Sequence, residues 1–129
     1  MRKSVFNEIR KVIADWGLTE FFQVNRTDGL ITCTNGYQVI FTGLDDTEKV
    51  KSITPEKGAI TDIWIEEATE TDRKSVKDLL KRQRGGDPNI PKRMTLSFNP
   101  ILQNHWIYAE YFTAIGWADD QTEYSGDEL

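Results

Sequence analysis

The 129-residue sequence contains one cysteine and one histidine, and it has no long hydrophobic run. A single cysteine, Cys33, cannot form an internal disulfide or a cysteine-rich zinc site, and it is typical of a reducing compartment. A single histidine, His105, leaves any serine elsewhere in the chain without the base that a Ser-His-Asp triad needs. No apolar run approaches the roughly 18 residues of a membrane-spanning helix, and the N-terminus leads into an amphipathic pattern rather than the apolar core of a signal peptide. We therefore expect a soluble, cytoplasmic protein that has no membrane partner.

Charge is modest overall and unevenly distributed. Sixteen Lys and Arg against 21 Asp and Glu give a formal net charge of −5, which argues against non-specific coating of nucleic acid. Two segments depart from this average: Arg73 to Arg93 holds eight basic and two acidic side chains, whereas Asp119 to Leu129 holds five acidic and no basic ones. Six Phe, four Trp and four Tyr can build a core. We therefore expect one ordered domain, or a piece of a larger one, that ends in a disordered acidic tail.

The first forty residues predict a helix followed by a small sheet. Apolar side chains recur at three- and four-residue steps across Ser4–Trp16, as on one face of a helix that Gly17 can end. Asn35-Gly36 is a strong two-residue hairpin signal, because both positions of such a turn take positive φ. The three predicted strands are Glu20–Asn25, Leu30–Thr34 and Tyr37–Thr42.

The second half predicts a strand–helix–strand unit. Ala59–Ile65 is apolar almost throughout, which is typical of a central strand covered on both faces. A helix is expected over Thr71–Arg84, with Leu79 and Leu80 directed inward, and a second strand over Arg93–Phe98. Because a crossover of this kind joins two parallel strands of one sheet, the residues predict an α/β protein. The other expected elements are a loop over Gly43–Gly58, with a helical turn near Thr47–Lys51, and a short aromatic helix over His105–Phe112.

Polar side chains follow both strands of this unit where the strands end. Glu66 and Glu67 come directly after the first strand, and Ser97 and Asn99 lie at the end of the second. Parallel strands bring their carboxyl ends to the same edge of a sheet, where the functional groups of open α/β proteins gather. Carboxylate oxygen and water are the usual surroundings of Mg²⁺, and a second carboxylate can orient or deprotonate an attacking water. The composition of this edge therefore suits a hard cation and a polarised water, although Glu66-Glu67 taken alone also fits the solvated start of a helix.

These motifs resemble those of a known family. Ile63–Ala68 (IWIEEA) looks like the Walker B segment of the large terminase subunit of tailed bacteriophages, and Thr95–Pro100 (TLSFNP) looks like the coupling motif of the same ATPase domain. The match is to the branch that carries Glu-Glu rather than Asp-Glu. Similarity to the family extends through Ser4–Glu8, Asp45–Ser52 and Asn104–Trp106.

The resemblance implies a motor that packages viral DNA into a procapsid. The implied fold is a partial P-loop NTPase of the ASCE type, with a mainly parallel sheet, an added β-hairpin and flanking helices. By resemblance, Glu66 holds the magnesium ion and Glu67 is the catalytic glutamate that activates water. Ser97 and Asn99 take the positions that sense the γ-phosphate of ATP. The implied partners of the full-length protein are double-stranded DNA, the terminase small subunit, the portal and further copies in a ring, all in the bacterial host cytoplasm.

One motif of the family is missing from the sequence. There is no Gly-x-x-x-x-Gly-Lys-[Ser/Thr], and Gly85-Gly86 is followed by Asp87-Pro88, which supplies no phosphate-binding lysine. The resemblance thus implies that residues 1–118 are part of the terminase ATPase domain without its Walker A segment, and that 119–129 form the acidic tail. We expect Mg²⁺ and ATP to act in the full-length protein and neither to bind tightly to this chain alone, which should be inactive.

Two other functions remain open on the residues alone. A small metal-dependent nuclease could use the acidic side chains near the first strand, although no basic catalytic partner stands beside them; a non-catalytic binding module is the other alternative. The basic segment Lys74–Arg93 fits a DNA contact, a subunit contact or a solvated helix face. His105 with Trp106 fits packing or a helix cap better than a metal site. The acids of the nuclease hypothesis are Asp62, Glu66, Glu67 and Glu70.

Overall fold

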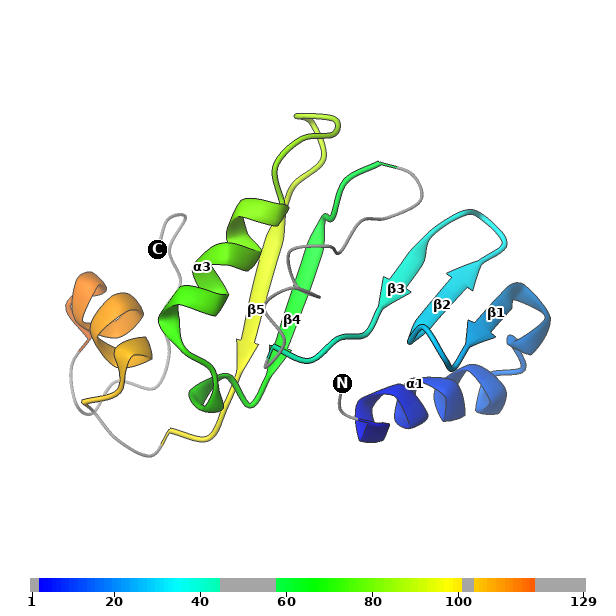
Figure 1. Ribbon diagram of the computed structural model, residues 1–129, viewed down its shortest axis with the longest axis horizontal. Helices are drawn as coiled ribbons and strands as arrows, with labels where there is room; N and C mark the ends of the chain where they lie inside the picture. Colours follow the sequence, from blue (N-terminus) through cyan, green and yellow to red (C-terminus); the bar gives the residue numbers. More distant parts are fainter. Residues whose placement is uncertain (1–2, 45–57, 101–103, 118–129) are drawn as a thin grey trace.

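A computed structural model describes residues 3–44, 58–100 and 104–117 (Figure 1). The described elements form two groups, a three-stranded antiparallel sheet with one helix and a two-stranded parallel sheet with its crossover helix. The predicted helical turn near Thr47–Lys51 and the acidic tail 119–129 lie outside the described residues. No helix in the described ranges is long and apolar enough to cross a membrane.

The N-terminal group confirms the predicted helix and the three predicted strands. The strands pair antiparallel in the order β1-β2-β3, with Val24 opposite Ile31 and Ile31 opposite Val39. Figure 1 shows the helix running beneath these strands. The elements are α1 (Lys3–Asp15), the 3₁₀ turn η1 (Thr19–Phe21), β1 (Phe22–Asn25), β2 (Leu30–Cys33) and β3 (Gln38–Ile40).

Gly17 ends α1 as the sequence predicts. It takes φ +69°, and the amides of Gly17 and Leu18 donate to the carbonyls of Ala14 (3.0 Å) and Ile13 (2.9 Å), which is the Schellman pattern. The helix is anchored by Phe6, a buried residue whose ring meets Phe41 edge to face at 5.0 Å. This aromatic contact fixes the helix against the residue that directly follows β3 (Gln38–Ile40).

The hairpin turn at Asn35-Gly36 differs from the predicted type. Only Gly36 takes a positive φ, +92°, whereas Asn35 does not. The amide of Gly36 donates to the carbonyl of Cys33 at 2.9 Å, and the amide of Cys33 donates to the carbonyl of Tyr37 at 2.8 Å. Thr34 and Asn35 are therefore the central residues of the turn, and Gly36 supplies the left-handed residue that follows it.

The C-terminal group confirms the βαβ unit. Strands β4 (Asp62–Glu66) and β5 (Arg93–Ser97) pair in parallel, and α3 (Arg73–Arg82) connects them. Asp72 rather than Thr71 caps α3, because its carboxylate accepts the amide of Ser75 at 2.7 Å. The same hydrogen bond holds the pKa of Asp72 below its ordinary value. The further elements are the 3₁₀ turn η2 (Ala68–Glu70), the π-helix η3 (Tyr108–Phe112) and the 3₁₀ turn η4 (Thr113–Ile115).

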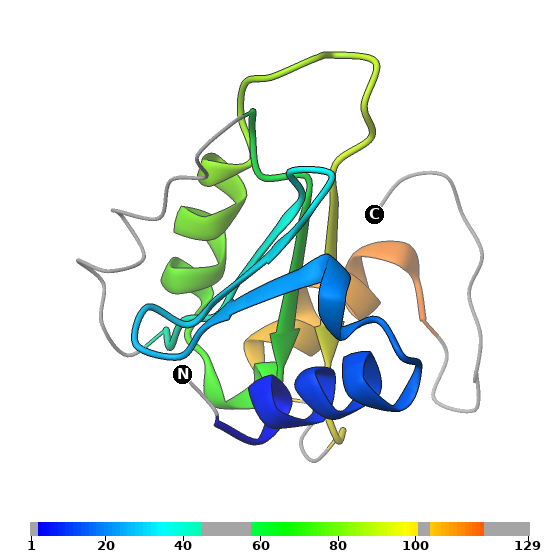
Figure 2. The ribbon, with the colours of Figure 1, turned by 90° about the vertical axis from the view of Figure 1, so that its right-hand side faces the viewer.

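One face of the parallel pair carries the core. Ile65 packs there with four other buried residues from η2, α3 and the segment before η3. The opposite face carries Trp64, which is 56% exposed, so the prediction that this strand is covered on both faces is wrong for the described residues. The view in Figure 2, turned by 90°, places α3 to one side of the two strands. The buried cluster consists of Ile65, Ala68, Val76, Leu79 and Ile107.

A buried glutamine ties the other end of the crossover together. The Gln83 side chain is 7% exposed, and its amide nitrogen donates to the carbonyls of Thr61 (3.1 Å) and Arg93 (2.7 Å). The end of α3 is thereby bound to the starts of both strands. These contacts and the parallel pairing establish a mixed α/β structure with a separate antiparallel sheet.

Neighbouring leucines of α3 provide a matched test of this packing. Leu79 is 5% exposed in the core, whereas Leu80, which we had expected to point inward, is 42% exposed. Leu79→Ala should lower the free energy of unfolding by about 2–5 kcal/mol, and Leu80→Ala should lower it by less than about 1 kcal/mol. Urea unfolding of both variants measures the difference. Equal losses would mean that α3 packs on the sheet through a different face.

Candidate functional site

The two predicted carboxylates lie at the carboxyl end of β4. Glu66 is the last residue of the strand and is paired in register with Ser97, the last residue of β5. Glu67 follows at the next position and precedes η2. The predicted meeting of Glu66 and Ser97 at one sheet edge is therefore confirmed, with Glu67 beside them in the chain.

The carboxylate of Glu66 is poorly satisfied. Its Oε2 atom is buried and has no hydrogen-bond partner among the residues that the structure describes. A buried polar atom without a partner is costly, and more so when it carries charge. An oxygen of this kind, at the end of a strand and next to a second carboxylate, is a suitable ligand for a hard cation such as Mg²⁺.

Glu67 has an unusual backbone conformation. With φ +52° and ψ +52° it is left-handed, and no other described residue except glycine has a positive φ. Such a conformation costs a side-chain-bearing residue about 1–2 kcal/mol and persists only where the surroundings impose it. The left-handed residue stands immediately after Glu66, the last residue of β4, and thus at the point where the strand ends.

Trp64 is a site residue that our sequence reasoning missed. It lies two residues before Glu66, on the same face of β4, and its indole Nε1–H donates to the hydroxyl of Ser97 at 2.8 Å. Because the Ser97 oxygen is the acceptor in this bond, its own O–H remains able to donate to a ligand. Strand alternation puts Trp64 and Glu66 on one face, but the hydrogen bond depends on the register with β5, which no sequence signal fixes.

Other predicted residues are not drawn into the same cluster. Asn99 is exposed, two residues beyond the end of β5, and has no hydrogen bond within the described part of the chain. Asp62 starts β4, four residues before Glu66, and its carboxylate accepts the hydroxyl of Thr61 at 2.9 Å. Among residues 3–44, 58–100 and 104–117, no three acidic, histidine or cysteine side chains form a metal-binding group. The described residues therefore do not assemble the four-acid cluster of the nuclease hypothesis.

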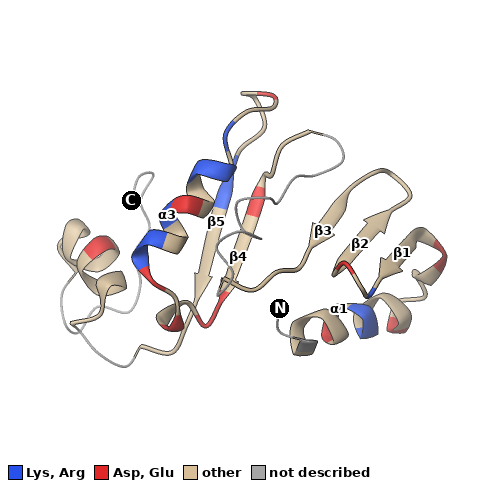
Figure 3. Ribbon diagram, viewed as in Figure 1, with Lys and Arg blue, Asp and Glu red and all other residues tan. Residues whose placement is uncertain are grey.

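The basic segment is partly used in internal ion pairs. Figure 3 shows Lys and Arg along α3. Glu110 of η3 accepts Arg73 Nε at 2.7 Å and lies 3.5 Å from Lys77 Nζ, and Lys81 lies 3.6 Å from Asp78 on the same helix. The hydrogen bond from Arg73 holds the pKa of Glu110 below its ordinary value. Arg73 and Lys77, in the N-terminal half of α3, thus pair with another element of the fold. Lys81, near the C-terminal end, is paired within the helix and is exposed.

Comparison with known proteins identifies a family. The family model for the phage terminase large subunit matches residues 1–129. The chain belongs to the phage terminase large subunit family. It is also 31% identical over 111 residues to the PBSX phage terminase large subunit of Bacillus subtilis (strain 168). That match covers 86% of this chain and 24% of the relative, so the terminase segment described here spans about a quarter of that protein.

The left-handed conformation of Glu67 makes a thermodynamic prediction for this terminase segment. Glu67→Gly should leave the free energy of unfolding unchanged or raise it by up to about 1 kcal/mol, because glycine adopts positive φ without steric cost. The matched control is Glu8→Gly in the middle of α1, which should lower it by about 1 kcal/mol. Thermal or urea unfolding of both variants measures the two changes in the free energy of unfolding. A loss at position 67 as large as that at position 8 would contradict the strained backbone.

Proposed function

We propose that this chain is part of the ATPase motor of a phage terminase large subunit, which drives double-stranded viral DNA into a procapsid. The observation that carries the proposal is the adjacent Glu66 and Glu67 at the carboxyl end of β4, beside Ser97 at the end of the parallel strand β5. Membership of the terminase family supports the role in DNA packaging. A partial P-loop NTPase fold of the ASCE type is the architecture we propose around this βαβ unit.

The two carboxylates take different roles in this proposal. Glu66, whose buried Oε2 has no hydrogen-bond partner in the described part of the chain, would hold Mg²⁺, which supplies positive charge to the phosphates of bound ATP. Glu67 would accept a proton from the water that attacks the γ-phosphate. The two adjacent carboxylates would thus be divided between the metal and the attacking water.

Ser97 and Asn99 would contact the γ-phosphate from the neighbouring strand. The hydroxyl of Ser97, held at its oxygen by Trp64, can donate its proton to a phosphate oxygen. Asn99 is exposed and able to offer its side-chain amide. Because Ser97 ends β5 and Asn99 lies two residues beyond it, loss of the γ-phosphate would act on the segment that leads to His105 and η3, which is a route from hydrolysis to movement.

The phosphate cradle is not encoded in these 129 residues, since no Walker A sequence is present. ATP hydrolysis is therefore proposed for a complete terminase large subunit that contains this segment. The terminase small subunit, the portal and other copies in a ring are the proposed partners of that protein.

The catalytic role of Glu67 is tested in such a complete terminase. Glu67→Gln should abolish steady-state ATP hydrolysis while leaving nucleotide affinity within a few-fold, because glutamine keeps the shape of the side chain but cannot accept a proton. General-base loss of this kind lowers kcat by about 10²–10⁴-fold. Phosphate release and the binding of a fluorescent nucleotide measure the two quantities.

Glu20→Gln, at an exposed position in η1, is the control and should hydrolyse ATP at the unaltered rate. Full turnover in Glu67→Gln would remove Glu67 from the mechanism. Loss of nucleotide binding in parallel with turnover would assign it to substrate binding instead.

The open end of α3 and the loop that follows provide the proposed DNA contact. Lys81 and Arg84 are exposed there. A packaging motor must grip any sequence, so it contacts phosphates rather than base edges. Lys81→Ala with Arg84→Ala should weaken binding about equally for unrelated duplexes. It should also reduce the slope of log K against log salt concentration by up to about two units.

Lys11→Ala with Arg26→Ala removes the same charge from exposed positions of the N-terminal group and serves as the control. Filter-binding titrations at several salt concentrations compare the two variants. Unchanged affinity and slope at Lys81 and Arg84, or the same loss in the control, would assign these side chains to solvent or to a subunit contact.

A further inference from the structure

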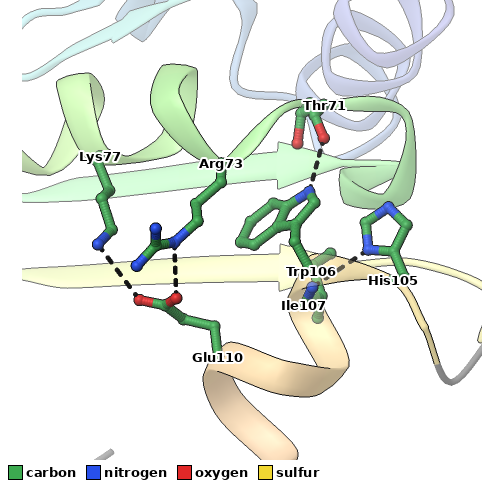
Figure 4. Close-up of polar contacts among 7 residues, drawn as sticks. All are labelled: Thr71, Arg73, Lys77, His105, Trp106, Ile107 and Glu110. Atoms are coloured by element: carbon green, nitrogen blue, oxygen red, sulfur yellow. Dashed lines mark hydrogen bonds and ion pairs between the residues drawn. The ribbon is translucent and has the colours of Figure 1, made fainter.

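Residues that follow β5 in the chain bind the loop between β4 and α3, and Figure 4 shows Trp106 bonded to Thr71 of that loop. His105 Nε2 lies 2.9 Å from the carbonyl oxygen of Thr69, and the Trp106 indole Nε1–H donates to the carbonyl of Thr71 at 2.9 Å. These bonds join residues 36 and 35 positions apart in the sequence. Both acceptors lie within four residues of Glu67.

The hydrogen bonds of His105 determine which ring nitrogen carries the proton. The backbone amide of Ile107 donates to Nδ1 at 3.2 Å, so Nδ1 must be the unprotonated nitrogen. Nε2 therefore carries the proton and donates to Thr69. This is one neutral tautomer, and it satisfies both partners; a doubly protonated ring would put a donor against the Ile107 amide.

The loop after Glu67 is held at almost every carbonyl. The carbonyl of Glu67 accepts the amide of Glu70 at 3.0 Å, and that of Ala68 accepts the amide of Thr71 at 3.1 Å and its hydroxyl at 2.6 Å. With the bonds from His105 and Trp106, the carbonyls of residues 67, 68, 69 and 71 all have donors. Local hydrogen bonds fix the turn, and those from His105 and Trp106 attach it to a segment about 35 positions further along the chain.

An ion pair supports the same connection. Glu110, one turn along η3, contacts Arg73 and Lys77 at the start of α3. The pKa of Glu110 is held below its ordinary value by the hydrogen bond from Arg73, so it is ionised at neutral pH. A carboxyl group with a lowered pKa contributes to the free energy of unfolding above its ordinary pKa. This contribution is lost as the pH falls through the lowered pKa. At neutral pH the connection is therefore intact at three points.

We propose that His105 and Trp106 are positioning residues that hold the left-handed Glu67 in place through the carbonyls of Thr69 and Thr71. The catalytic consequence rests on the proposed function, while the connection itself does not. Because the same segment leaves β5 just after Ser97, it joins the two strand ends of the site by a second route besides the sheet pairing. A strained residue such as Glu67 needs surroundings of this kind to remain in one conformation.

The connection is tested first in this chain, where His105 is the sole histidine and its NMR signals need no assignment. Ring ¹⁵N spectra at neutral pH should show the neutral tautomer with the proton on Nε2. His105→Phe should speed hydrogen exchange at the amides of Glu70 and Thr71 by about tenfold, the effect of losing one net hydrogen bond. Exchange in α1 should be unchanged. The Nδ1–H tautomer, or exchange that rises equally in α1, would overturn the proposal.

The catalytic consequence is tested in a complete terminase that contains the segment. His105→Phe and Trp106→Phe each retain an aromatic ring and lose the N–H donor. Each should lower kcat about 10- to 100-fold, as misplacement of a catalytic group does, and leave KM for ATP within about twofold. His105→Gln retains an N–H donor and should recover part of the rate. Trp16→Phe, at a 74% exposed position, is the matched control.

The outcomes separate this inference from the proposed function. If the unaltered terminase hydrolyses ATP and Glu67→Gln does not, but His105→Phe and Trp106→Phe are fully active, the positioning role is wrong and the function stands. If Glu67→Gln is fully active, the function is wrong, and the NMR and exchange results still decide whether the connection exists. Equal changes in kcat and KM, without rescue by His105→Gln, would mean general damage to the fold and would also overturn the positioning role.

Discussion

The parallel pairing of β4 and β5 is the constraint on which the candidate site depends. It sets Glu66 opposite Ser97 at the last position of each strand. A shift of one residue would turn Glu66 toward the core face that Ile65 now occupies, because successive side chains of a strand point to opposite faces. The register is held at the opposite end by Gln83, which bonds to Thr61 and Arg93, and along the strands by the packing of Ile65 against α3. The hydrogen bonds of Gln83 at one end of the sheet thus help to determine which side chains lie together at the other end.

A second consequence concerns how the site tolerates strain. Glu66 ends in a buried oxygen without a partner in the described residues, and Glu67 adopts a conformation that suits glycine better. Each of these two features, taken by itself, lowers the free energy of unfolding. Both are in keeping with a site arranged for a cation and a water molecule, and the surrounding hydrogen bonds from Thr71, His105 and Trp106 provide the compensation.

Much of the architecture could be predicted from the sequence because it depends on local patterns. The βαβ unit followed from two apolar runs separated by an amphipathic segment, and the parallel arrangement of its strands predicted that Glu66 and Ser97 lie at the same sheet edge. The prediction for Leu80 was wrong because residues three and four apart in a helix share a face: α3 meets the sheet through the stripe that holds Val76 and Leu79, and Leu80 lies beside this stripe. The bonds of Trp64, Gln83 and His105 could not be predicted, because each joins residues distant in the sequence. The left-handed Glu67 has no sequence signal, since Gly and Asn are the usual residues there.

The central claim is that the carboxyl edge of β4 and β5 is the nucleotide-hydrolysing site of a terminase. A crystal structure of a complete terminase large subunit that contains this segment, with Mg²⁺ and a non-hydrolysable ATP analogue, tests this directly. The account predicts the metal beside Glu66, the γ-phosphate near Ser97 and the carboxylate of Glu67 facing the position of the attacking water. Nucleotide and metal bound away from this edge, with Glu66 and Glu67 contacting only protein, would contradict it.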